Sequence, residues 1–198
     1  MTPMDREREQ WLVARLKQRD ADAFDEIYAT FHSRLFGFLA RLSRRRDVAE
    51  DLVEETWLRL VSHAPRLRPD TRLGPWLFTV ARNLYMSYCR SRQVDYDARA
   101  ALHLWPVPPV DASPFEAASA TELQGQVEAA LATLPGLYRE ALLLVAFEGC
   151  TPSEAAVICG VSAETLRQRL SRARAMLASR LDPSIDALAL PQLKGVLS

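Results

Sequence analysis

Residues Thr151–Arg174 read TPSEAAVICGVSAETLRQRLSRAR, and they contain two helix-start signals separated by a glycine. Thr151 and Glu154 have the T-x-x-E spacing of a reciprocal capping box, with a proline at the first helical position. Gly160 can adopt the left-handed conformation that ends a helix tightly, and Ser162 can then cap a second helix. The stretch therefore predicts two short helices joined by a tight turn, a helix-turn-helix.

The second helix of this motif has two different faces. Its apolar face has helical spacing and consists of Leu166, Leu170, Ala173 and Leu177. Its opposite face carries the polar side chains Glu164, Arg167, Gln168, Ser171 and Arg172. An ordinary helical hairpin would share the capping and the apolar face, but it does not require these polar groups. Because they suit base edges and phosphates in the major groove, a DNA-reading helix is the favoured interpretation.

The composition of the 198-residue chain is that of a globular protein, with 48% hydrophobic and 25% charged residues. The 25 Lys and Arg residues equal the 25 Asp and Glu residues, so the formal net charge is zero. This balance argues against a simple basic coat for nucleic acid. It fits a protein whose acidic surface contacts a protein partner while a local basic face contacts DNA.

The sequence shows neither the pattern of a targeting signal nor that of a catalytic motif. No run of about 18 apolar residues occurs, so we expect no membrane insertion. The N-terminus MTPMDREREQW has no apolar signal-peptide core, which predicts a cytoplasmic protein. The cysteines and histidines have no metal-ligand spacing; they are Cys89, Cys150, Cys159, His32, His63 and His103. We therefore expect no metal, no cofactor, no disulfide and no enzymatic activity.

The first part of the chain has the apolar periodicity of helices, over residues 5–19 and 22–42. The basic run Arg44–Arg46 follows, and a solvated turn is favoured there over a contact to the DNA backbone. Asp47 with Glu50 is predicted to cap a third helix as a capping box. The outer face of that helix is acidic and consists of Glu50, Asp51, Glu54, Glu55 and Arg59. This face is either solvated or docked on a basic protein surface.

A loop over residues 65–74 precedes a fourth helix, which Pro75 is predicted to open. The inward face is expected to hold Leu77, Val80, Ala81, Leu84 and Tyr88. The outward face is expected to hold Thr79, Arg82, Asn83, Met86 and Arg90, flanked by Phe78 and Tyr85. Cations, amides and exposed rings together suit single-stranded nucleic acid. The alternative is that Trp76, Phe78 and Tyr85 cover the rim of the core.

Residues 93–118 contain four prolines and several acidic residues, which predicts a flexible, largely extended acidic linker. Beyond it, Ser119 is expected to cap a helix, Pro135 to open a helix at 136–148, and the last helix of the helix-turn-helix to end near Leu181. The sequence thus predicts an all-α protein of two small helical domains. The expected boundaries are 1–92, the linker 93–118, 119–181, and a tail at 182–198 of unknown role.

Three segments of the chain together resemble a known family. AEDLVEETWLRL (Ala49–Leu60) and PWLFTVARNLYMSYCR (Pro75–Arg90) resemble region 2 of bacterial sigma factors, and Leu134–Leu177 resembles region 4. The short linker is similar to that of the extracytoplasmic-function (ECF) subgroup of the sigma-70 family. The resemblance implies a region 2 helical bundle and a region 4 helix-turn-helix domain. It also implies that the protein binds core RNA polymerase and directs promoter-specific initiation.

The same resemblance implies a role for each surface. The acidic strip Glu50, Asp51, Glu54, Glu55 and Arg59 would dock on the β′ clamp helices, and region 4 on the β flap. The −10 element, read partly as a melted non-template strand with one base extruded, would be contacted by Arg68, Asp70, Arg72, Trp76, Thr79, Arg82, Asn83, Met86 and Arg90. The −35 duplex would be contacted by Ser162, Glu164, Thr165, Arg167, Gln168, Ser171, Arg172 and Arg174. An anti-sigma factor is a further expected partner.

Two other classes of protein compete with this hypothesis. A sigma mimic would keep the fold only to sequester an anti-sigma factor, and it would have no need of exposed Arg167, Gln168 and Arg172. A helix-turn-helix repressor would need a dimerisation or ligand-sensing domain, whereas residues 1–92 offer an acidic docking helix and a face suited to single strands.

Overall fold

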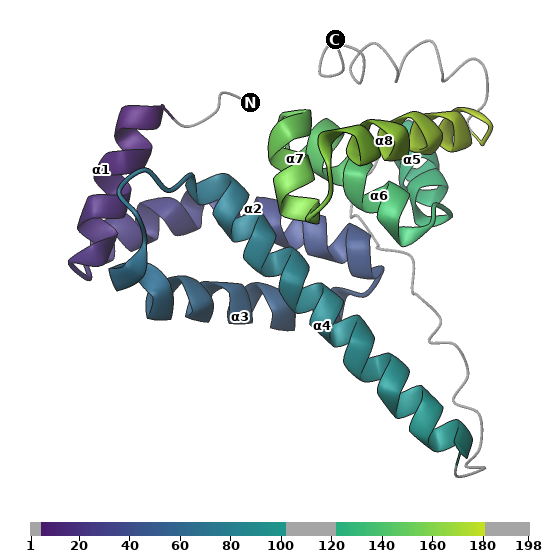
Figure 1. Ribbon diagram of the computed structural model, residues 1–198, viewed down its shortest axis with the longest axis horizontal. Helices are drawn as coiled ribbons and strands as arrows, with labels where there is room; N and C mark the ends of the chain where they lie inside the picture. Colours follow the sequence, from purple (N-terminus) through teal and green to yellow (C-terminus); the bar gives the residue numbers. More distant parts are fainter. Residues whose placement is uncertain (1–4, 102–121, 181–198) are drawn as a thin grey trace.

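The computed structural model describes residues 5–101 and 122–180, which are mostly helical (Figure 1). No strand occurs in these two ranges, which confirms the predicted all-α fold. We refer to α1–α4 as the N-terminal unit and to α5–α8 as the C-terminal unit. The elements are α1 (Arg6–Lys17), α2 (Ala21–Ser43), α3 (Arg46–His63), the 3₁₀-helix η1 (Ala64–Arg66), α4 (Leu73–Ala101), α5 (Glu122–Ala132), α6 (Gly136–Leu142), the π-helix η2 (Leu143–Phe147), α7 (Pro152–Cys159) and α8 (Ala163–Ala178).

The N-terminal unit is built around α2, which contacts α1, α3 and α4. Apolar residues recur along α2 with the helical period, so one stripe of the helix is buried: Ile27, Phe31, Leu35, Phe38 and Leu42. The ring of Phe38 stands edge-on to that of Phe78 on α4, with centroids 5.4 Å apart. Because Phe78 is only 1% exposed, it belongs to the core and not to the outward face of α4.

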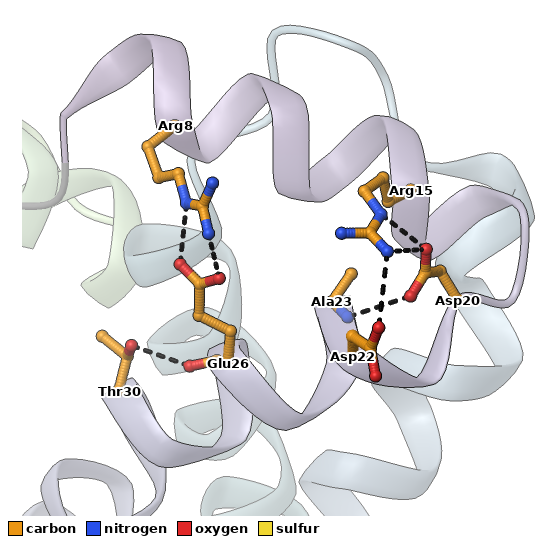
Figure 2. A network of polar contacts seen from close by, with 7 residues as sticks. All are labelled: Arg8, Arg15, Asp20, Asp22, Ala23, Glu26 and Thr30. Atoms are coloured by element: carbon orange, nitrogen blue, oxygen red, sulfur yellow. Dashed lines mark hydrogen bonds and ion pairs between the residues drawn. The ribbon is translucent and has the colours of Figure 1, made fainter.

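Ion pairs hold α1 against the start of α2 (Figure 2). The Arg8 guanidinium pairs with Glu26, and hydrogen bonds from Arg8 hold the pKa of this carboxyl below its ordinary value. Arg15 donates from Nε to Asp20 at 2.5 Å. Asp20 also caps α2, since its Oδ1 accepts from the backbone N–H of Ala23 at 3.2 Å. The short connection between α1 and α2 is therefore fixed at both ends.

The helix-turn-helix has the local structure that its capping signals predict. The Thr151 hydroxyl accepts from the Glu154 N–H at 3.2 Å, and the Glu154 carboxylate accepts from the Thr151 N–H at 2.9 Å. Gly160 is in the left-handed region with φ +64°, and Ser162 caps α8 by accepting from the Thr165 N–H at 3.1 Å. The predicted inner face of α8 is buried at Leu166, Leu170, Ala173 and Leu177.

Several predicted element ends differ from the structure. The predicted capping box Asp47/Glu50 is wrong, because α3 begins at Arg46 and no side chain caps its start. The carboxylates of Asp47 and Glu50 instead accept hydrogen bonds from the Arg45 and Arg46 side chains. α4 begins at Leu73 and not at Pro75. It continues to residue 101, so residues 93–101 are helical and not extended, since no glycine or proline follows Pro75 before residue 106.

The remaining differences concern the C-terminal unit. The predicted helix at 136–148 is α6 followed by the π-helix η2, and α8 ends at Ala178 and not near residue 181. Residues 102–118, the cap Ser119 and the tail 182–198 lie outside the described residues. Within the described helices, none combines the length and the apolar character needed to cross a membrane.

Candidate nucleic-acid and protein interfaces

The polar face of α8 is exposed and partly organised by its own carboxylate. Glu164 accepts from Arg167 Nη2 at 2.6 Å and from Gln168 Nε2 at 3.3 Å. The hydrogen bond from Arg167 holds the pKa of Glu164 below its ordinary value, so the group is an anion at neutral pH. Glu164 therefore orients two neighbouring donors, which would lessen its repulsion of a phosphate.

The predicted −35 residues differ in how accessible they are. Six of them are exposed: Glu164, Arg167 and Gln168, together with Ser162, Ser171 and Arg172. The Arg172 guanidinium lies 3.5 Å from the Tyr138 hydroxyl. Thr165 is half-buried, with its hydroxyl 2.9 Å from that of Ser162. Arg174 is also half-buried, and its Nε is enclosed without a hydrogen-bond partner. Six of the eight predicted residues thus form one open surface.

The predicted outward face of α4 is only partly open. Asn83 and Arg90 are exposed, whereas Met86 is half-buried. Thr79 donates back to the Pro75 carbonyl at 2.7 Å. The Arg82 Nε donates at 2.7 Å to Glu140 of α6, so this cation is already paired with a carboxylate of the C-terminal unit.

The inward face of α4 is rotated from the predicted one. Leu77 and Ala81 are buried as expected, together with Leu73 and Phe78, but the other predicted inward residues are half-buried: Val80, Leu84 and Tyr88. The rings of Tyr85 and Trp76 lie at the rim of the core. Tyr85 donates to the Leu42 carbonyl at 3.3 Å, and the ring of Trp76 stacks on His63 with centroids 5.6 Å apart.

The loop before α4 is held by a glutamate that sequence patterns did not single out. Glu9 of α1 is 4% exposed. Its Oε1 accepts from the backbone N–H of Leu73 at 2.6 Å, and its Oε2 accepts from Arg72 Nε at 2.8 Å. Glu9 therefore caps α4 from a distant helix and orients one of the predicted −10 arginines. Arg68, by contrast, pairs within the loop with Asp70 at 3.1 Å.

Replacing Glu9 by alanine is expected to lower the free energy of unfolding by about 1–3 kcal/mol, because the buried N–H of Leu73 loses its acceptor. Urea denaturation followed by circular dichroism measures this loss. Glu7→Ala on the same helix is the matched control, since Glu7 is exposed, and its effect should stay within about 0.5 kcal/mol. Equal losses in the two variants would show that the contacts of Glu9 contribute no stability of their own.

A groove of about 920 Å³ runs between α2 and α3 beside the acidic strip. Its floor is aromatic: Trp57 lies edge-on to Phe24, and its Nε1 donates to His32 Nδ1 at 3.3 Å. Leu58 and Val61 line the groove and are 57% and 56% exposed. Of the five predicted polymerase-binding residues, four are exposed and one is half-buried. Three of the four carboxylates among them line this groove: Glu50, Glu54 and Glu55. An apolar groove edged with carboxylates is typical of a protein-binding site.

Two of the three cysteines are buried. Cys150 and Cys159 are 8% and 2% exposed, and burial raises the pKa of both thiols to about 12. Such thiols are almost fully protonated at neutral pH and are poor nucleophiles. Cys89 on α4 is half-buried.

Comparison with known proteins gives the same two regions. Residues 27–94 match the family model described as Sigma-70 region 2, and residues 124–177 match that described as Sigma-70, region 4. The chain is 38% identical over 161 residues to the ECF RNA polymerase sigma factor EcfG of Rhodopseudomonas palustris, covering 79% of this chain and 83% of that protein. It is 33% identical over 162 residues to the RNA polymerase sigma factor CarQ of Myxococcus xanthus, covering 81% and 90%.

Two solved structures are similar in fold. The sigma factor RpoE in complex with the anti-sigma factor NepR, from Bartonella quintana, superposes with a TM-score of 0.66 and 30% identity. That match covers 79% of this chain and 94% of the other. CnrH in complex with the cytosolic domain of CnrY has a TM-score of 0.64 at 23% identity, with 87% and 96% covered, and supports the fold alone.

Proposed function

Because the chain belongs to the ECF subgroup of the sigma-70 family of RNA polymerase sigma factors, we propose that each of its surfaces has a separate role in transcription initiation. α8 reads the −35 element as duplex. α4 and the loop before it bind the −10 element as it melts. The groove and acidic strip of α2 and α3 dock on the β′ clamp helices, and the C-terminal unit docks on the β flap.

The observation that carries this proposal is the open polar face of α8 in a helix-turn-helix whose two helices both have side-chain caps at their N-termini. Arg167, Gln168 and Arg172 are exposed there, at positions where a helix in the major groove meets base edges. A sigma mimic would have no need of these donors. They therefore support a sigma factor that directs initiation itself.

The proposed domain division follows the two matched regions. Residues 1–92 act as region 2 and residues 119–181 as region 4, with the acidic linker between them reaching toward the active-site cleft of the polymerase. Because its proposed partners are core RNA polymerase and promoter DNA, we propose that the protein acts in the cytoplasm. Because the related RpoE is in complex with an anti-sigma factor, we propose a partner of that kind here as well.

Reconstitution with core RNA polymerase tests the function. Sequencing of transcript 5′ ends from genomic templates should give a restricted set of start sites with shared upstream elements near −10 and −35. A protein that binds core polymerase but supports no initiation on any template would be a mimic. One that binds duplex DNA alone, tightly and as a dimer, would be a repressor.

Arg172→Ala is expected to weaken promoters through the −35 element by about 1–3 kcal/mol, since a forked contact to a base is lost. Transcript yield from a template with an intact −35 element, compared with one whose −35 sequence is scrambled, measures the effect. Arg180→Ala is the control, because Arg180 is exposed but follows the end of α8. An equal loss on both templates would show that Arg172 does not read bases.

A further inference from the structure

Glu164 is the one acid among the eight predicted −35 residues. The other seven carry N–H or O–H donors, which suit phosphates and the acceptor edges of bases. A carboxylate can only accept hydrogen bonds at neutral pH, and it repels the DNA backbone. An acid in the first turn also stabilises a helix through the helix dipole, but that role needs no contact with neighbouring side chains. The contacts of Glu164 therefore indicate a second role.

The Glu164 carboxylate links two side chains that lie one turn further along α8. It accepts from Arg167 Nη2 at 2.6 Å on one oxygen and from Gln168 Nε2 at 3.3 Å on the other. Both members of the ion pair remain open to solvent, with 64% of the Glu164 side chain and 65% of the Arg167 side chain exposed. The remaining N–H groups of Arg167 make no hydrogen bond within the described part of the chain. The exposed face of α8 thus presents a donor and an acceptor side by side.

A G·C base pair presents the complementary pattern in the major groove. Guanine offers the acceptors O6 and N7, and cytosine offers its amino group N4 as a donor. O6 and N4 are joined by a Watson–Crick hydrogen bond, so their separation is about 2.9 Å. Arg167 Nη2 and Glu164 Oε2 are 2.6 Å apart, which is close to that separation. One ion pair can therefore span one base pair, with the guanidinium on guanine and the carboxylate on cytosine.

Other base pairs fit this ion pair less well. Reversing the pair to C·G places the carboxylate against O6 and N7 of guanine, where an anion meets two acceptors. A T·A pair keeps an acceptor for Arg167, thymine O4, and an amino donor for Glu164, adenine N6, but the guanidinium loses its forked contact. An A·T pair again opposes the carboxylate to an acceptor, thymine O4. The expected order of preference is thus G·C, then T·A, then the two reversed pairs.

We propose that Glu164 determines −35 specificity at one base pair, where the Glu164–Arg167 ion pair selects G·C in a single orientation. The proposal rests on the proposed function, because it takes α8 as the helix that reads the −35 duplex. The carboxylate accepts from the cytosine amino group and repels the reversed pair, while Arg167 donates to guanine. Gln168 holds the second carboxylate oxygen, which limits the rotation of the Glu164 side chain.

Transcription from a promoter library tests this role with the full chain bound to core RNA polymerase. The template keeps the −10 region of a promoter found by start-site sequencing, its −35 element is fully randomised, and barcoded transcripts give the base preference at each position. Wild type should prefer G·C over C·G at one position by at least about tenfold. Glu164→Ala should reduce this preference to about twofold or less at that position alone, because an unanchored Arg167 can reach guanine on either strand. Arg167→Ala should reduce the preference at the same position, and Glu164→Gln, which has both a donor and an acceptor, should tolerate either orientation.

Glu154→Gln is the matched control, because it removes the other carboxylate of the helix-turn-helix and lies on α7, outside the reading face. The Glu154 carboxylate accepts from the Thr151 N–H at 2.9 Å, and glutamine can still complete the capping box, so this variant should keep the wild-type preference at every position. A wild-type profile without a G·C position, a preference that Glu164→Ala leaves unchanged, or a loss spread equally over all positions would overturn the role of Glu164. Wild-type initiation that depends on the −35 sequence leaves the proposed function standing in each of these cases. Wild-type initiation that ignores the −35 sequence, or no initiation at all, contradicts the proposed function itself.

Discussion

Replacing Phe38 by alanine is expected to lower the free energy of unfolding by about 3–5 kcal/mol. Phe38 is fully buried at the centre of the N-terminal unit, and its ring packs edge-on against Phe78. Alanine removes this aromatic pair and leaves a cavity that the crossing of α2 and α4 cannot close. Small domains are stabilised by about 5–15 kcal/mol in total, so the loss would be a large share. Urea denaturation, with the midpoint and slope fitted separately, measures it.

Phe147→Ala is the matched control for this change. Phe147 is 39% exposed, and its ring lies 5.1 Å from the Arg41 guanidinium. Losing one such contact at a partly exposed site should cost about 1 kcal/mol or less. A cost for Phe38→Ala as small as that for Phe147→Ala would contradict the central role of the α2–α4 contact in the core.

The helix-turn-helix could be predicted because its signals are local. A capping box, a left-handed glycine and a serine cap each act within four residues, and they recur in the structure at Thr151, Gly160 and Ser162. The apolar stripe of α8 is equally local, because helical spacing alone decides which residues share a face. The family resemblance, which the comparisons confirm, also depended on such short motifs.

The predictions that failed involve side-chain contacts that sequence spacing does not select, most of them between distant parts of the chain. Glu9 caps α4 from 64 positions away, and no spacing rule connects it with Leu73. Asp47 had the pattern of a cap, but the neighbouring Arg45 competes for its carboxylate. Arg82 was expected to point into solvent, yet Glu140 of the C-terminal unit pairs with it. Long arginine side chains reach many partners, and sequence spacing does not select among them.

Leu58→Asp is expected to weaken binding to core RNA polymerase by at least about 100-fold while leaving the fold intact. Leu58 lines the groove between α2 and α3 and is 57% exposed, so the free protein loses little packing. In the proposed complex the groove is covered, and a carboxylate enclosed there would have to lose its water without a partner. The nearby carboxylates Glu54 and Glu55 make a further negative charge still less favourable.

Ala14→Asp separates this effect from a general change in charge. Ala14 is exposed on α1, outside the groove, and its replacement adds the same single negative charge. Surface plasmon resonance with immobilised core polymerase should give near wild-type affinity for this control and a much faster dissociation for Leu58→Asp. Thermal unfolding should place the midpoints of both variants within a few degrees of wild type. If Leu58→Asp binds as tightly as Ala14→Asp, the groove is not covered in the complex, and the acidic strip alone must account for docking.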